Sequence, residues 1–138
     1  MCSSDLLMKV ASGGELARFL LALKVVLADR GSAPTLIFDE IDTGVGGAVA
    51  DAIGMRLEKL GARVQVLAVT HAPQVAARAS RHYVIAKSAI DKSKRVATRV
   101  AEVASEKRRE EIARMLAGAE ITKEARAAAA RLISAAAH

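Results

Sequence analysis

Aromatic residues are scarce in this sequence. Its 138 residues include two Phe, one Tyr and no Trp, which together make up 2% of the chain. A core must therefore be built from Leu, Ile, Val and Ala. The shortage also argues against a stacking platform for single-stranded nucleic acid, because aromatic rings hold the bases in such proteins. With 52% hydrophobic residues, the chain still has enough apolar side chains to exclude a disordered polymer.

The sequence has one cysteine, and it contains neither a long apolar run nor the pattern of an export signal. The single cysteine, Cys2, cannot form an internal disulfide, which fits a reducing compartment. No stretch approaches the roughly 18 consecutive apolar residues that predict a membrane helix. The first six residues have neither the basic nor the apolar segment of a signal peptide. These features predict a cytoplasmic chain without membrane contact, of a length that suits one domain.

Acidic residues are outnumbered, but not evenly along the chain. The net charge is +6, with 21 Lys or Arg against 15 Asp or Glu. Residues 1–60 carry a net charge of −2, whereas residues 61–138 carry +8. This asymmetry has two interpretations, a polyanion partner or the solvated faces of helices and hairpins. A standalone basic module that binds nucleic acid is therefore one candidate function.

Helix and strand patterns alternate along the first part of the chain. Apolar residues recur at helical spacing from Leu16 to Leu27, and Ser12 is suited to cap that helix. The elements expected next are a strand at 35–38, a helix at 49–60, a strand at 64–69 and a short helix at 73–79. The first strand is a short continuous apolar run, which is typical of a strand buried on both faces, and the second is also expected to be buried. The alternation predicts a parallel sheet covered by helices.

The last part of the chain has a different pattern. Strands at 82–87 and 95–103 should form an antiparallel hairpin with a polar loop between them. Two helices are expected after the hairpin. One covers residues 105–116 and ends before Gly118, and the other begins near Thr122 and is rich in Ala and Arg.

Two acids, Asp39 and Glu40, come directly after the first expected strand. In a parallel sheet, ligands bind outside the carboxyl ends of the strands. An acid pair at this position suits a Mg²⁺ site, in which Asp39 holds the metal through water. Glu40 would then orient or deprotonate an attacking water. The alternative interpretation is an ordinary strand-to-turn transition with two surface acids.

A histidine and a glycine-rich helix start are the other candidate features. Ser12–Gly14 offers a hydroxyl and unhindered N–H groups at a helix N-terminus, which can bind an anion or simply cap the helix. His71 follows the second expected strand and could polarise a phosphate oxygen or hold a water, although a lone histidine is more often structural. His82 and His138 lie at no metal-ligand spacing from it.

Taken in order, these segments resemble the sequence motifs of ABC-type ATPases. Ala11–Glu15 resembles their signature motif, with Ala in place of the usual Leu. Leu36–Glu40 resembles the Walker B strand with its catalytic glutamate. Asp42 lies in a segment similar to the D-loop, and His71 is similar to the switch histidine. The resemblance narrows to the SMC-like ATPases of bacterial DNA repair through three longer segments, 38–47, 69–76 and 111–118.

The resemblance implies a fold, a chemistry and partners. The fold is the C-terminal lobe of an ABC-type (P-loop NTPase) ATPase head, with parallel strands covered by helices, a β-hairpin and two C-terminal helices. Two such heads hold ATP and Mg²⁺ between them, so the implied partners are a second identical head and, in the full-length protein at the bacterial nucleoid, DNA. The implied roles are Mg²⁺ binding for Asp39, activation of the hydrolytic water for Glu40, γ-phosphate sensing for His71, coupling across the dimer interface for Asp42, and contacts to the partner's ATP for Ser12, Gly13, Gly14 and Glu15.

The motif that cradles the ATP phosphates is absent from the sequence. None of the nine glycines precedes a lysine, so the chain contains no Gly-x-x-x-x-Gly-Lys-[Ser/Thr] segment. The resemblance therefore implies a partial head at residues 7–138 after an atypical lead-in at 1–6, without the Walker A lobe and the coiled coil. By itself such a chain should not hydrolyse ATP. The sheet edge that meets the missing lobe should be exposed and apolar, so the chain should self-associate. A transporter ATPase subunit is the alternative, although transporter D-loops usually contain Ser-Ala-Leu-Asp.

Overall fold

The computed structural model describes residues 19, 22–23, 33–89 and 96–137. The chain divides into two compact units, residues 1–78 and residues 79–138, and each is described by itself. The helix expected after Ser12 lies almost wholly outside the described residues. Two members of its apolar face, Phe19 and Leu23, are described and are exposed. That face is therefore not part of the core that the described residues form.

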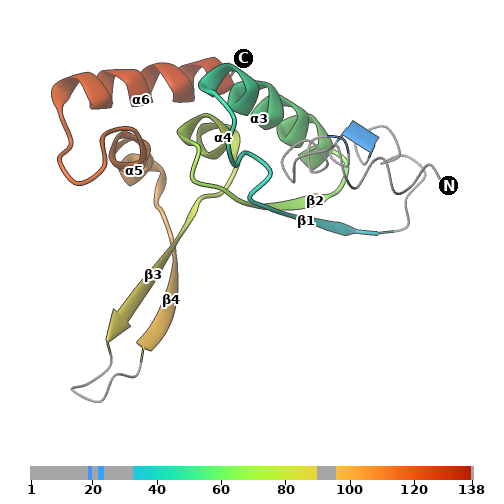
Figure 1. Cartoon of the computed structure of the whole chain (residues 1–138), viewed down its shortest axis with the longest axis horizontal. Helices are drawn as coiled ribbons and strands as arrows, with labels where there is room; N and C mark the ends of the chain where they lie inside the picture. Colours follow the sequence, from blue (N-terminus) through green and yellow to red (C-terminus); the bar gives the residue numbers. More distant parts are fainter. Residues whose placement is uncertain (1–18, 20–21, 24–32, 90–95, 138) are drawn as a thin grey trace, which may run out of the picture. The chain divides into compact units, whose positions relative to one another are not determined.

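A parallel pair of strands and two helices make up the described part of the first unit (Figure 1). In chain order they are β1 (Thr35–Asp39), α3 (Gly47–Gly61), β2 (Gln65–Val69) and α4 (Pro73–Arg78). The strands pair in register from Thr35 with Gln65 to Asp39 with Val69. The predicted parallel arrangement is confirmed, and each element begins and ends within two residues of the prediction.

One face of this sheet packs against the helices and forms an aliphatic core. Phe38 of β1 is 4% exposed, and it packs with Ile53, Leu57 and Leu60, which recur at helical spacing along α3. Val75 of α4 completes the cluster. Since burying one large apolar side chain stabilises a protein by about 1.5–3 kcal/mol, these contacts hold both helices to the sheet.

A glycine and an arginine fix the contact between α3 and α4. Gly54 is buried, and a Cβ atom at this position would lie 2.8 Å from Arg78 Cδ and 3.2 Å from the Gln74 carbonyl oxygen. The Arg78 guanidinium donates to Asp51 Oδ1 from Nε and Nη2, at 3.1 Å each, and to Glu58 Oε2 at 3.0 Å. The close approach that Gly54 permits is therefore secured by a half-buried ion-pair cluster.

The other face of the sheet is apolar and exposed. Ile37, Leu67 and Val69 are 64%, 47% and 48% exposed, and Ile37 lies opposite Leu67 in the register. The prediction of burial on both faces is therefore wrong for Ile37, and the prediction of a buried second strand is wrong for Leu67 and Val69. The physical reason is that no helix or strand in the described part of the chain covers this side. What the two strands present is an exposed apolar surface.

We expect this apolar surface to make the chain self-associate, because contiguous exposed apolar area favours burial against another surface. Replacing Ile37 and Leu67 with Lys should weaken association on the order of tenfold or more, which corresponds to about 1.4 kcal/mol. Sedimentation velocity over a concentration series measures the change. The matched control is Met55→Lys, since Met55 on α3 is also 47% exposed. A parent chain that stays monomeric at high micromolar concentration would contradict the prediction.

A hairpin and two helices make up the described part of the second unit (Figure 1). They are β3 (Tyr83–Ala89), β4 (Val96–Glu102), α5 (Ser105–Ala117) and α6 (Lys123–Ala136). The strands pair antiparallel, from Tyr83 with Glu102 to Ala89 with Val96. The predicted hairpin and both predicted helices are confirmed. In the described part of the chain, no helix is long and apolar enough to span a bilayer.

Small side chains and one ion pair hold α5 and α6 together. Ile112, Ala113 and Ala129 are completely buried, so the helices approach each other closely along an Ala-rich seam. At the surface, the Arg126 guanidinium donates three hydrogen bonds of 2.7–3.0 Å to the Glu110 carboxylate. This fork lowers the pKa of Glu110 and fixes the register of the two helices.

The turn between α5 and α6 contains the glycine and the threonine that the sequence predicts at the helix ends. Gly118 has a φ of 79°, in the left-handed region that glycine tolerates best, and its N–H donates to the Arg114 carbonyl at 2.8 Å. The Thr122 hydroxyl accepts a hydrogen bond from the Ala125 N–H at 3.2 Å. A glycine stop and a threonine cap therefore set the ends of these helices.

All of the formal net charge belongs to the second unit. Residues 79–138 contain 13 Lys or Arg and seven Asp or Glu, which leaves +6. Residues 1–78 contain eight basic and eight acidic residues. The first unit is therefore neutral overall, and the second is strongly basic.

Candidate functional site

The carboxyl ends of β1 and β2 lie side by side, and three candidate residues lie at these ends or just after them. Asp39 pairs with Val69 in the register, and the Glu40 N–H donates to the Val69 carbonyl at 3.1 Å. His71 comes two residues after Val69. The structure therefore brings the segments that carry the acid pair and the imidazole to the same edge of the sheet. The side chains of Asp39, Glu40 and His71 are all exposed.

The turn after β1 holds Glu40 in an unusual backbone conformation. Its φ is 50°, in the left-handed region that residues with a Cβ rarely adopt. The Glu40 carbonyl accepts a hydrogen bond from the Thr43 N–H at 3.1 Å, which closes the turn. A left-handed residue of this kind costs about 1–2 kcal/mol, so neighbouring contacts must hold it in place. Such strain is often found at functional sites.

Asp42 lies inside this turn and is bonded within its own chain. Its side chain is 2% exposed. Oδ2 accepts hydrogen bonds from the Thr70 hydroxyl and from the Ala72 N–H, the latter at 3.0 Å. The same N–H also donates to Thr70 Oγ1 at 2.9 Å. The Asp42 carboxylate thus joins two loops of one chain. The coupling between two heads that the resemblance implies stays a prediction.

Carboxylates make this edge of the sheet acidic. Asp39, Glu40 and Asp42 fall within four residues, and none of the ion pairs found among the described residues involves Asp39 or Glu40. Mg²⁺ is usually bound through one or two carboxylates together with substrate phosphates. The exposed Asp39 carboxylate fits such an ion. Within the described residues, no group of three or more His, Cys, Asp or Glu side chains could hold a metal ion. Phosphate oxygens of a bound substrate would therefore have to supply the other ligands.

One predicted segment lies outside the described residues, and two residues near His71 have contacts that the sequence did not predict. The segment Ser12–Glu15 lies outside the described residues, so its anion site stays a prediction. Sequence reasoning missed Thr70 and Ala72 as hydrogen-bond partners of Asp42. They are 28 and 30 residues away along the chain, and no local motif signals such a contact.

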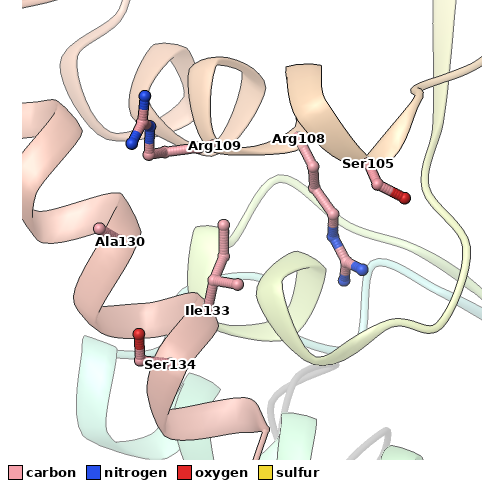
Figure 2. Close-up of a pocket in the computed structure, with 6 residues that line it drawn as sticks. All are labelled: Ser105, Arg108, Arg109, Ala130, Ile133 and Ser134. Atoms are coloured by element: carbon pink, nitrogen blue, oxygen red, sulfur yellow. The ribbon is translucent and has the colours of Figure 1, made fainter.

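A cavity of about 350 Å³ opens between α5 and α6, and none of the candidate residues lines it. Figure 2 shows that two of its basic side chains, Arg108 and Arg109, point in different directions. Arg108 donates to the Ala79 carbonyl, and burial lowers the pKa of Arg108. Because the two charges do not converge, the cavity is not a formed anion site. Its lining consists of Ser105, Arg108, Arg109, Ala130, Ile133 and Ser134.

His82 has a structural role at the base of the hairpin. The imidazole is half-buried, and burial lowers the pKa of His82, which nearby Glu111 opposes. The His82 carbonyl accepts a hydrogen bond from the Val103 N–H at 2.8 Å, which extends the hairpin pairing. These contacts fit a residue that closes the hairpin.

The sequence relatives of this chain are DNA repair proteins. No family model matches the chain. It is 50% identical to the DNA repair protein RecN of Xylella fastidiosa (strain 9a5c) over 127 residues, which is 92% of the chain. Identity to the RecN of Rickettsia felis is 46% over 131 residues, or 95% of the chain, and to that of Bacillus subtilis 47% over 116 residues, or 84%. The chain spans 22%, 24% and 20% of the lengths of these three relatives.

A solved structure supports the same assignment at the level of the fold. It is described as "Structural biochemistry of ATP-driven dimerization and DNA stimulated activation of SMC ATPases" and is 21% identical to this chain. The TM-score is 0.58, with 81% of this chain and 66% of that chain covered. The ATPase-head fold expected from the sequence is confirmed. Because the sequence relatives are DNA repair proteins, they favour this assignment over a transporter subunit or a standalone basic module. By sequence the chain is related to DNA repair proteins named RecN, and by fold to the head of an SMC ATPase.

Proposed function

We propose that this chain supplies the Walker B and switch-histidine half of an ATP-hydrolysing head in a RecN-type DNA repair protein. The observation that carries the proposal is the parallel register of β1 and β2, with Asp39 opposite Val69. This register puts Glu40 one residue and His71 two residues after neighbouring strand ends, where ligands bind in parallel sheets. The RecN relatives, at 46–50% identity, support the repair context.

Each candidate residue at this edge has one task in the proposed head. Asp39 holds Mg²⁺, which neutralises phosphate charge when it is bound. Glu40 accepts a proton from the attacking water, a role that needs an accessible carboxylate. His71 hydrogen-bonds to the terminal phosphate, where charge increases during transfer. The exposure of all three side chains is consistent with these tasks.

The remaining parts of the nucleotide site come from other segments. Since the chain has no phosphate-loop motif, that loop belongs to another lobe of the head. Ser12, Gly13, Gly14 and Glu15 contact ATP held by a second head. The structural neighbour concerns ATP-driven dimerization of SMC ATPases, which supports an ATP-bridged dimer. The dimer acts on DNA in the bacterial cytoplasm, at the nucleoid.

Reconstitution of the head tests this proposal. The chain is co-expressed with the N-terminal lobe of a RecN relative that carries the phosphate loop, and phosphate release is measured with and without Mg²⁺. We expect Mg²⁺-dependent hydrolysis that neither part shows by itself. The control is the same lobe with its phosphate-loop lysine replaced by Ala. A stable complex without hydrolysis would contradict the proposal, as would hydrolysis by the 138-residue chain alone.

A further inference from the structure

Asp42 is a buried carboxylate whose hydrogen bonds are concentrated on one oxygen. Asp42 is 2% exposed, and among the described residues no other residue with a charged or polar side chain is buried to this degree. Oδ2 accepts from Thr70 and from Ala72, whereas Oδ1 is buried and has no hydrogen-bond partner among the described residues. Burying a charge costs free energy that only full pairing offsets. Stability alone therefore does not explain a carboxylate at this position.

The two groups that bind Asp42 lie on either side of His71. Thr70 precedes the histidine and donates through its hydroxyl, and Ala72 follows it and donates through its N–H. Ala72 also directly precedes α4, and its carbonyl accepts hydrogen bonds from the N–H groups of Val75 and Ala76 at 3.1 Å each. The backbone of His71 is therefore held at both sides by one carboxylate.

The other end of this connection is the turn that carries Glu40. Asp42 comes two residues after Glu40, and the turn is closed by the hydrogen bond from the Thr43 N–H to the Glu40 carbonyl. The Glu40 N–H is bonded to the end of β2 through Val69. One carboxylate thus links the turn after β1 to the loop after β2.

We infer that Asp42 is a positioning residue that fixes the loop of His71 against the turn of Glu40, so that both act on the same nucleotide. This role rests on the proposed function of Glu40 and His71. This role is exerted within one chain, to which both donors to the Asp42 carboxylate belong. The coupling across a dimer interface stays a separate prediction. The carboxylate acts through the loop and does not touch the nucleotide.

Amide hydrogen exchange on the 138-residue chain tests the structural part of this inference. At low micromolar concentration, Asp42→Ala should speed exchange in a peptide containing residues 70–72 by about tenfold or more. The Ala72 N–H then loses the Asp42 carboxylate, and the Thr70 hydroxyl that remains as its acceptor loses the same anchor. Asp42→Asn keeps one acceptor oxygen and should stay within about twofold of the parent. The matched control is Ile53→Val, which loosens the same core without touching either loop. Unchanged exchange in Asp42→Ala would overturn the inference.

Kinetics of the reconstituted head test the functional part. Asp42→Ala should lower kcat by about tenfold or more with little change in KM for ATP, and Asp42→Asn should restore most of the loss. Ile53→Val should leave kcat unchanged. Faster exchange without a fall in kcat would refute the positioning role, and so would a failure of Asp42→Asn to restore turnover. If Glu40→Gln and His71→Ala both leave turnover intact while Asp42→Ala still frees the loop, the proposed function fails and the structural link stands.

Discussion

Replacing Glu40 with Gln should lower ATP turnover by the reconstituted head by about a hundredfold or more. General-base catalysis contributes about 10²–10⁴-fold to a reaction, and an amide cannot accept the proton of the attacking water. Gln has nearly the same size and backbone preference as Glu, so the left-handed turn at this position should persist. Phosphate release under saturating ATP measures the change in kcat, and equilibrium binding of ATP should change by less than about twofold.

The control for this substitution is an acid of the same type outside the candidate site. Glu120 is exposed in the turn between α5 and α6, and Glu120→Gln should leave turnover and binding unchanged. Equal activity of Glu40→Gln and the parent would remove Glu40 from the chemistry. If ATP binding is lost together with turnover, Glu40 contributes to binding of the nucleotide and not specifically to the chemical step.

Replacing Gly54 with Val should destabilise the first unit by about 3 kcal/mol or more. A Cβ atom at this position already meets Arg78 Cδ at 2.8 Å and the backbone oxygen of Gln74 at 3.2 Å. Arg78 cannot move away freely, because its guanidinium is held by Asp51 and Glu58. Overpacking of this kind typically costs about 1–3 kcal/mol, and the second methyl group of Val adds to the clash. Urea unfolding followed by circular dichroism measures the loss.

A second glycine of the same helix is the matched control for Gly54. Gly61 ends α3, and a Cβ atom there meets nothing within 4 Å. Since Ala is favoured over Gly in helices by up to about 1 kcal/mol, Gly61→Ala should leave stability unchanged or raise it slightly. Gly54→Ala should fall between Gly61→Ala and Gly54→Val. If all three variants unfold at the parent's urea concentration, the packing of α3 against α4 is looser than the structure indicates.

Much of the fold was predictable because local patterns determine it. The apolar runs that become β1 and β2, and the helical spacing of Ile53, Leu57 and Leu60, do not depend on distant parts of the chain. The same holds for Gly118, whose left-handed conformation ends a helix. The position of the candidate site followed from one further rule, that parallel strands meet with their carboxyl ends at one edge.

What could not be predicted depends on contacts between distant residues. Asp42 finds its partners 28 and 30 residues away, and its sequence neighbours give no sign that its carboxylate is buried. A continuous apolar run predicts burial on both faces, but the exposure of Ile37 and Leu67 depends on which other elements cover the sheet. The need for glycine at position 54 likewise arises only where α4 crosses α3.

Because the two units differ in net charge, ionic strength should affect the binding of partners to one unit more than to the other. Counterions screen exposed charges beyond a Debye length of about 8 Å at physiological salt. A polyanion is therefore attracted by residues 79–138, with their charge of +6, and salt weakens this attraction. Residues 1–78 carry no net charge, so contacts made through the apolar sheet surface respond little to the same salt. A salt titration thus separates electrostatic recruitment by one unit from hydrophobic association by the other.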